Sequence, residues 1–309
     1  MVFERRGKIC DSASLGLPWA GKNIMTPLPM ILPTGDVRVY LTICDTDNVG
    51  RVGFLDLDGS NPSTIKAVST VPALNTGMPG AFDEHGVLPT SLLNVDGRLY
   101  LYYSAYQRQV SVPYTILSGL AVSDDGGLTF SRMSDCPLLE RCDTQMFQRS
   151  AIEVMRRGDK YLMWYTAGMG WQDNDGHLVP RYDIEYLESD DFKVWTAKPK
   201  VSLALRDDEF GLTMPQVKYS GGVFRMIYSI RSVSKGYRLG YAESKDGVRF
   251  VRMDEKLVFA PSESGWDSEM ICFGKIITVA GRTYLFYCGN HYGIGGMGWA
   301  ELVKKGCDI

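Results

Sequence analysis

A glycine followed by an aromatic-rich run recurs five times along the chain. The glycines are Gly35, Gly97, Gly158, Gly222 and Gly281, so the intervals are 62, 61, 64 and 59 residues. A period of this length is typical of repeat proteins, in which each unit buries its apolar face against the next unit. The recurrence therefore favours one ring or stack of similar units over two unlike domains.

Each repeat has the pattern of several short strands. An apolar strand, as at residues 88–94, precedes the aromatic run, and a further strand pattern, as at residues 239–244, follows it. Asp-Gly turns between β-branched and aromatic residues indicate hairpins, and no long stretch has a helical period. In three repeats a turn and a fourth strand are expected, at residues 124–130, 190–195 and 245–250. We therefore predict an all-β fold, a five-bladed β-propeller of four-stranded antiparallel blades, as a single domain over residues 1–309.

The fifth repeat stops after its third strand, at residues 301–303, and lacks the terminal turn and strand. The N-terminal residues 2–9 have the length and pattern to supply the missing strand. We expect them to pair with the last repeat and to close the ring, which would leave no open sheet edge.

Charge and composition exclude several classes of function. The net charge is −3, and lysines and arginines are scattered, so neither a nucleic-acid partner nor a membrane partner is expected. Residues 1–11 are charged and no stretch is long and apolar enough for a membrane helix, so we expect a cytoplasmic protein. Seven unpatterned cysteines and three histidines predict reduced, mostly buried thiols, with no metal site and no cofactor. The oligomeric state stays open.

The innermost strand of each blade lines the axis of a propeller. Functional side chains are therefore expected just before, or at the start of, the strand that precedes each glycine marker. This rule selects five stretches, which are residues 23–27, 82–89, 146–150, 207–215 and 265–271. Acids occur in three of them, namely Asp83, Glu84, Asp207, Asp208, Glu209, Asp267 and Glu269. A solvated loop charge is the ordinary interpretation of any single acid, but the recurrence predicts carboxylates that converge on one funnel.

Convergent carboxylates are what cleavage of a glycosidic bond requires, because one acid must be protonated and a second ionised. We predict Asp83, Glu209 and Glu269 as the catalytic residues. Glu209 is the expected acid, since apolar neighbours such as Phe210 would desolvate it. Asp83 is the expected ionised partner, with Arg149 or His85 nearby to hold its charge.

Other residues near these stretches are candidates for binding the substrate. Trp171 and Trp266 lie in loop contexts and could stack on a sugar, although most aromatic side chains in such a fold pack between blades. The two histidines near the loops could equally be packed and structural. The full set of predicted binding residues is Glu84, His85, Arg149, Trp171, Trp266, Asp267 and His291.

At these residues the sequence resembles the glycosidases of the five-bladed propeller superfamily, which includes arabinanases, invertase-like fructosidases and β-mannoside phosphorylases. More narrowly, it looks like a bacterial group associated with lipopolysaccharide and other surface-glycan gene clusters. The matching segments are residues 82–87, 112–114, 262–271 and 289–293. The resemblance implies the propeller fold and acids from the inner strands of separate blades.

The chain departs from that pattern at the first inner strand, where Thr26-Pro27 stands in place of the superfamily's usual Asp-Pro. Three functions therefore stay open. The first is a glycoside hydrolase-like enzyme that acts on a glycan or sugar precursor in a central, carboxylate-lined pocket. The second is a phosphorylase with basic groups for phosphate, for which Arg149, Arg181, His85 and His291 are available. The third is a non-catalytic propeller that binds a carbohydrate or a sugar nucleotide.

Overall fold

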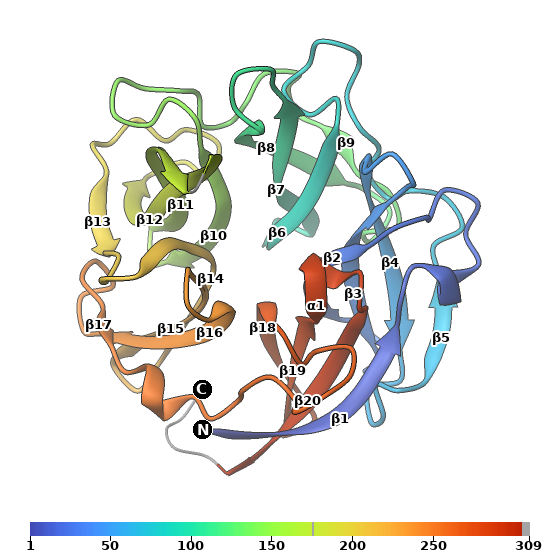
Figure 1. The fold of residues 1–309 in the computed structure, drawn as a ribbon. Coiled ribbons are helices and arrows are strands. Elements are labelled where there is room, and N and C mark those ends of the chain that lie inside the picture. The colour runs from blue at the N-terminus through green and yellow to red at the C-terminus, as the bar shows by residue number, and fades with distance from the viewer. Residues whose placement is uncertain (175, 305–309) are drawn as a thin grey trace.

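The computed structural model describes residues 1–174 and 176–304, and Cys307 lies outside these ranges. The described chain is built mainly of strands (Figure 1). Its helical segments are short, namely η1 (Ala13–Leu15), η2 (Asp254–Lys256) and α1 (Asn290–Gly293). Within the described ranges, none of the helices has the length and apolar character needed to cross a membrane.

The strands form one four-stranded sheet and two eight-stranded sheets. The first eight-stranded sheet contains β2 (Ile24–Ile31), β3 (Val37–Cys44), β4 (Gly50–Leu57), β5 (Ile65–Val68), β6 (Gly86–Val95), β7 (Arg98–Arg108), β8 (Tyr114–Ser123) and β9 (Ser131–Arg132). The second contains β10 (Arg149–Arg157), β11 (Lys160–Asn174), β12 (His177–Ser189), β13 (Lys200–Leu203), β14 (Glu209–Ser220), β15 (Val223–Ser232), β16 (Gly236–Ser244) and β17 (Val251–Arg252). The four-stranded sheet contains β18 (Cys272–Val279), β19 (Arg282–Cys288), β20 (Met297–Lys304) and β1 (Val2–Cys10).

Each eight-stranded sheet consists of two antiparallel runs joined at a single parallel residue pair. The joining pairs are Gly50 with Gly86, and Tyr182 with Gly211. A glycine is required at both joints, because a Cβ on Gly86 would lie 2.2 Å from the ring of Tyr106 and one on Gly211 would lie 2.3 Å from the ring of Tyr182. We refer to the runs β2–β5, β6–β9, β10–β13, β14–β17 and β18–β20 with β1 as the first to fifth runs.

The fourth strands are short and lie later in the chain than predicted. Residues 124–130, 190–195 and 245–250 form bends, turns and loops, and the outermost strands β9, β13 and β17 follow them. The prediction of a strand within those three segments is therefore wrong. Turn-forming residues such as Asp125 bind the backbone there instead, since its carboxylate accepts hydrogen bonds from the N–H groups of Leu128 and Thr129.

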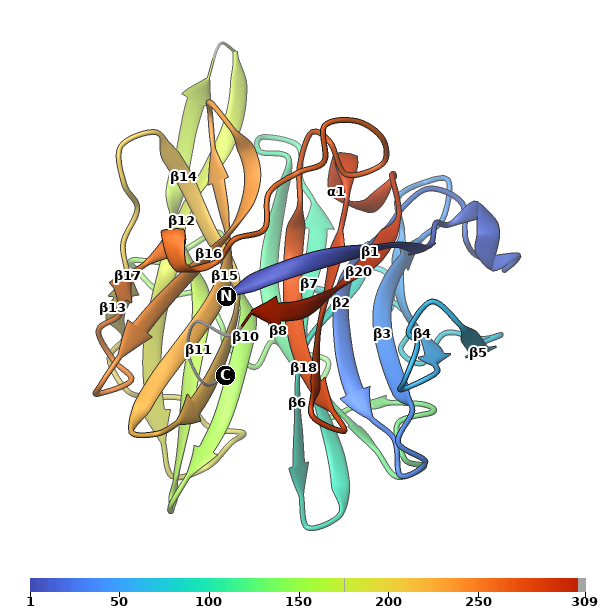
Figure 2. The ribbon, with the colours of Figure 1, turned by 90° about the horizontal axis from the view of Figure 1, so that it is seen from below.

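The N-terminal strand supplies the missing strand of the last repeat, as predicted. β1 pairs antiparallel with β20, with Phe3 opposite Leu302 and Glu4 opposite Glu301. Figure 2 shows β1 lying alongside β20. Phe3 is buried against the fourth and fifth runs, so this strand is anchored by apolar burial as well as by its hydrogen bonds.

The core lies between neighbouring runs, which are arranged around a centre (Figure 1). Tyr40 and Tyr103 pack between the first and second runs, and Tyr102 and Met163 between the second and third. Corresponding apolar clusters join the third run to the fourth, the fourth to the fifth, and the fifth back to the first. The runs therefore close into a ring in which each sheet is buried on both faces.

The innermost strands carry an irregularity near their inner ends. Register shifts occur there in β2, β6, β10, β14 and β18. In four of these strands a non-glycine residue has a positive φ, namely Thr26, Ala151, Met214 and Phe273, at 51° to 59°. Bulges of this kind turn side chains out of the regular alternation, and strained residues tend to gather at functional sites.

Six cysteines are described, and all six are free thiols. Cys10, Cys44, Cys272 and Cys288 are buried, whereas Cys136 is exposed and Cys142 is partly exposed. The prediction of mostly buried cysteines is confirmed for these six residues, of which four are buried, and the reduced state stays a prediction.

Candidate functional site

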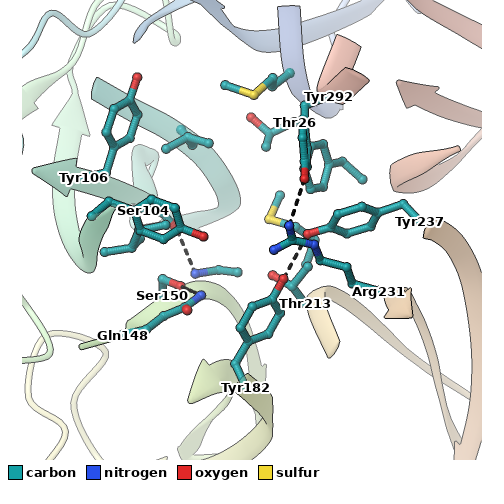
Figure 3. Close-up of a pocket in the computed structure, with 17 residues that line it drawn as sticks. Thr26, Ser104, Tyr106, Gln148, Ser150, Tyr182, Thr213, Arg231, Tyr237 and Tyr292 are labelled. Carbon is teal, nitrogen blue, oxygen red and sulfur yellow. Dashed lines mark hydrogen bonds between the residues drawn. The ribbon is translucent and has the colours of Figure 1, made fainter. Parts of the chain in front are cut away.

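The four positive-φ residues line one central cavity of about 360 Å³ (Figure 3). Its wall takes residues from all five innermost strands, from the second or third strands of the second, third and fourth runs, and from α1. The polar lining residues are Thr26, Ser104, Tyr106, Tyr114, Gln148, Ser150, Tyr182, Thr213, Arg231, Tyr237 and Tyr292. The apolar ones are Met25, Leu88, Ile116, Ala151, Met214 and Phe273. A cavity of this size, partly apolar with convergent hydroxyl and amide groups, suits a small ligand.

The lining contains no aspartate and no glutamate among the described residues. The prediction of a carboxylate-lined central pocket is therefore wrong for this cavity. Four of the five stretches that the inner-strand rule selected do contribute to the wall, through Thr26, Leu88, Gln148 with Ser150, and Thr213 with Met214. What reaches the cavity from these stretches is hydroxyl, amide and apolar side chains.

One guanidinium stands out in the wall of the cavity. Arg231, on β15, donates a hydrogen bond from Nη2 to the hydroxyl of Tyr292 at 3.0 Å. Its guanidinium carbon lies 4.5 Å from the ring centre of Phe210 and 5.7 Å from that of Tyr237. Within the described ranges, no carboxylate lies within 4 Å of this guanidinium.

The phenols around Arg231 are neutral groups. Burial raises the pKa of Tyr114, Tyr237 and Tyr292 above the ordinary value for a tyrosine. Tyr182 and Tyr237 share a hydrogen bond of 3.0 Å between their hydroxyls, which holds both rings in place (Figure 3). The phenols therefore orient the site but do not neutralise its positive charge.

Asp83 lies in a buried ion pair. It is 1 % exposed, and its Oδ2 accepts a hydrogen bond of 2.6 Å from Nε of Arg132 on the outermost strand of its run. The hydroxyl of Tyr103 lies 3.4 Å from the same oxygen. Asp83 does not line the cavity.

Asp267 repeats this arrangement in the fifth run. It is 1 % exposed and accepts hydrogen bonds from Nε of Arg5 at 2.6 Å and from the hydroxyl of Tyr287 at 2.9 Å. Arg5 belongs to β1, the outermost strand of the run. Asp267, a predicted binding residue, thus forms an ion pair within its own run and does not line the cavity.

Glu209 is also paired with an arginine of the outermost strand. Its two carboxylate oxygens accept hydrogen bonds of 2.6 and 2.7 Å from Arg252 on β17. Glu209 faces a separate, smaller cavity of about 190 Å³ together with Asp207, Asp208 and Arg181. We call the three pairs Asp83–Arg132, Glu209–Arg252 and Asp267–Arg5 the acid–arginine clasps.

The third predicted catalytic residue, Glu269, lies at the surface. Its carboxylate is 3.2 Å from Nε2 of His291, and both side chains are more than half exposed. Glu84 and His85 form a similar local pair, with 3.5 Å between the carboxylate and Nδ1. The structure therefore brings Glu269 to His291 and Glu84 to His85, but it brings none of the four to the lining of the central cavity.

Arg149 and Trp171 lie near the cavity without lining it. Arg149 donates from Nη1 to the carbonyl of Glu140 at 2.7 Å, and its guanidinium lies 5.4 Å from the ring centre of Tyr165. The ring of Trp171 packs edge-on against Tyr114, a cavity residue, with 5.4 Å between the ring centres. Trp171 thus supports the cavity wall from behind Tyr114.

Trp266 is a packing residue, so its predicted role as a sugar-stacking face is not supported. Its ring stacks on Tyr287 with 5.3 Å between the centres. A Cβ on Gly289 or on Gly298 would lie 2.5 Å from the indole. The glycine-rich segment after β19 therefore makes room for this side chain.

Within the described ranges, no group of three or more histidine, cysteine, aspartate or glutamate side chains is arranged to hold a metal ion. The polar groups that converge on the cavity are hydroxyls, one amide and one guanidinium. This set suits hydrogen bonding to a polar organic ligand.

Sequence reasoning missed Arg231 and the tyrosines around it. Arg231 follows Tyr228 by three positions, where other repeats have Tyr106, Gly168 and Asn290. Arg231 is the second-last residue of β15, the second strand of its run, and a charged residue at that place was a readable signal. The rule that weighted innermost strands and acids passed over it.

Comparison with known proteins finds no protein-family model that matches the chain. An uncharacterized protein of Mycobacterium tuberculosis, Rv1502, is 27% identical over 303 residues, which cover 98% of this chain and 99% of that protein.

Solved structures with the same fold include a glycosyl hydrolase from Bacteroides ovatus, with a TM-score of 0.74 and 15% identity over 97% of this chain and 93% of that one. A structure from the GH130 family of mannoside phosphorylases has a TM-score of 0.73 and 16% identity over 97% and 93% of the two chains. An endo-arabinase from Bacteroides thetaiotaomicron has a TM-score of 0.65 and 12% identity over 95% and 99%. The chain therefore has the propeller-type fold of these glycoside hydrolases and phosphorylases.

Proposed function

We propose that the protein binds a carbohydrate in its central cavity. The observation that carries the proposal is the lining itself, in which hydroxyls and an amide from all five runs converge on a space of about 360 Å³. Hydroxyl and amide groups suit the hydroxyls of a sugar, and Phe273 or a tyrosine ring suits its apolar face. The likeness of the fold to glycoside hydrolases supports the same ligand class.

Binding without hydrolysis is the favoured form of this proposal. Hydrolysis of a glycosidic bond ordinarily needs two carboxyl groups, placed about 5–10 Å apart on either side of the bond. No carboxyl group lines the cavity among the described residues. Asp83 and Glu209, which were expected to act there, are held in acid–arginine clasps.

Cleavage of a glycosidic bond is the second candidate, because the structural neighbours are glycoside hydrolases and a mannoside phosphorylase family. In this form Asp83, Glu209 and Glu269 would have to reach the substrate from outside the cavity wall. A phosphorylase would also need a phosphate ion beside one of these carboxylates. Hydrolysis and phosphorolysis both predict turnover of a glycoside, whereas binding alone does not.

Three broader expectations belong to the same proposal. We propose that the five runs are the five blades of a propeller, which their shared pattern of strand pairing supports. A link to surface-glycan metabolism and a cytoplasmic location rest on the sequence alone.

The test combines binding with turnover. Calorimetric titration with a panel of neutral and acidic sugars and sugar nucleotides should give binding that Gln148→Ala and Thr213→Val each weaken, since both remove a polar group of the wall. Arg98→Ala, which removes an exposed arginine paired with Asp124, is the control and should leave the affinity unchanged. Release of sugar from glycosides, with Glu209→Gln abolishing it, would replace the binding form by the hydrolytic one. Absence of binding to every sugar would overturn the proposal.

A further inference from the structure

Arg231 is the one charged side chain among the 17 residues that line the cavity in the described part of the chain. The guanidinium stays protonated at any ordinary pH. Its position in the wall, with Tyr292 above it and Tyr182 and Tyr237 beside it, is visible in Figure 3. Whatever ligand occupies the cavity therefore meets a full positive charge.

The charge of Arg231 is not balanced by the protein around it. Several partly buried arginines in the described ranges are paired with carboxylates, as Arg132 is with Asp83 and Arg252 with Glu209. Arg149, which has no carboxylate partner, donates to the carbonyl of Glu140 instead. No such pair exists for Arg231 among the described residues, and its polar neighbours are phenols whose pKa burial raises. Arg231 is half-buried, and partial removal of its charge from water without a counter-ion costs free energy that an anion in the cavity would offset.

The guanidinium also keeps donors available. It has five N–H groups, and one is hydrogen-bonded to the hydroxyl of Tyr292. The ring of Phe210 covers it at 4.5 Å, which holds the planar group in place from one side. Paired N–H donors on an oriented guanidinium match the geometry of a carboxylate or a phosphate group.

We propose that the cavity selects a sugar that carries an anionic oxygen group, a carboxylate or a phosphate, and that Arg231 binds this group. The inference rests on the proposed carbohydrate function and adds the charge class of the ligand. The remaining wall, including Ser150 and Thr213, faces the sugar's hydroxyls. Free inorganic phosphate carries the same anionic oxygens and is the alternative ligand for Arg231.

The experiment compares four probes by calorimetric titration, namely a hexuronate, a hexose 6-phosphate, the neutral hexose and inorganic phosphate. One or both of the charged sugars should bind roughly 10- to 100-fold more tightly than the neutral hexose, the range expected for charge-assisted hydrogen bonds. Arg231→Gln should remove that preference and leave the weak affinity for the neutral hexose. Arg225→Gln, which changes the same charge at the other end of β15, should keep the preference.

A melting curve shows whether the variant is folded. Because Arg231 has no carboxylate partner, Arg231→Gln should melt no lower than the unchanged protein, and the charged sugar should raise the melting temperature of the unchanged protein but not of the variant.

The outcomes separate this inference from the function it rests on. Equal affinity for neutral and charged sugars, unchanged in Arg231→Gln, would overturn the anionic ligand and keep the carbohydrate function. Binding of inorganic phosphate without any sugar, lost in Arg231→Gln, would keep the anion site and overturn the carbohydrate function. No binding of any probe would overturn both.

Discussion

The carboxylate of Glu153 lies 3.1 Å from the ammonium of Lys275, although the two residues are 122 positions apart. Glu153 is on β10 and Lys275 on β18, so the pair links two innermost strands of different runs. Lys275 also donates to the carbonyl of Pro215 at 2.7 Å, and Glu153 accepts from the N–H of Val217 at 3.3 Å. One buried ion pair thus joins the third, fourth and fifth runs where the ring has its smallest radius.

Breaking this pair should destabilise the ring. Lys275 is 1 % exposed, so Lys275→Met would leave Glu153 as a buried charge without its partner and should cost about 3–5 kcal/mol of the free energy of unfolding. The double variant Glu153→Gln with Lys275→Met should recover much of that loss, because no unpaired charge remains. Urea unfolding measures both. The exposed pair of Arg98 and Asp124 is the control, and a loss in Lys275→Met as small as that in Arg98→Ala would contradict the prediction.

Mutation of the acid–arginine clasps should lower the stability of the fold without changing ligand binding. Asp83→Asn and Asp267→Asn each remove the charge opposite a partly buried arginine, so each should lower the melting temperature by several degrees or more. Sugar affinity in the central cavity should stay unchanged, since neither residue lines it. Glu269→Gln, at an exposed site, is the matched control and should leave the melting temperature nearly unchanged. Loss of ligand binding in Asp83→Asn without loss of stability would show that Asp83 takes part in binding and would contradict its structural role.

The repeat was the most informative part of the sequence. Period and alternation are local properties, so the inner strands and the stretches that precede them could be predicted from the sequence. The pairing of β1 with β20 could be predicted because the fifth repeat lacks a fourth strand of its own. The positions of the fourth strands could not be predicted. β9 and β17 have two residues each, too few for a sequence pattern, and they are strands only because they pair with β8 and β16.

The recurrence of acids had a structural cause that the sequence did not reveal. Asp83, Glu209 and Asp267 recur because in three runs an acid just before or at the start of the innermost strand pairs with an arginine of the outermost strand. The arginines are 43 to 262 positions away, so no local pattern links them to the acids. Arg231 was missed for the opposite reason, since it occurs in one repeat and its importance comes from tyrosines on other strands.

Deletion of residues 1–9 should destabilise the protein far more than loss of a frayed end would. β1 pairs along β20, Phe3 is 5% exposed, and Arg5 neutralises Asp267. Phe3→Ala alone should cost about 3–5 kcal/mol, as for other buried phenylalanines. Glu4→Ala, at a side chain that is 56% exposed, is the control within the same strand. An unchanged melting temperature after the deletion would show that β1 does not hold the ring closed.

Asp183 should make the stability depend on pH. It is 5% exposed, its Oδ1 has no hydrogen-bond partner among the described residues, and burial, followed by the nearby charge of Glu185, raises its pKa to about 7. The unfolded chain has an aspartate pKa of about 3.9, so the folded state binds the proton more tightly. The contribution of Asp183 to stability is therefore fully present below about pH 4, falls as the pH rises towards 7, and is constant above that.

Asp183→Asn removes the titration and keeps the shape of the side chain. Its gain in stability over the unchanged protein should be near its minimum at pH 4, should grow through pH 5 and 6, and should level off above pH 7 at up to about 4 kcal/mol. Urea unfolding at pH 4, 6 and 8 measures this gain. Asp190→Asn, which makes the same chemical change at a side chain that is 81% exposed, is the matched control. A gain for Asp183→Asn that is the same at pH 4 and pH 8 would mean that the carboxyl of Asp183 is ionised in the folded protein throughout, with a partner that offsets its burial.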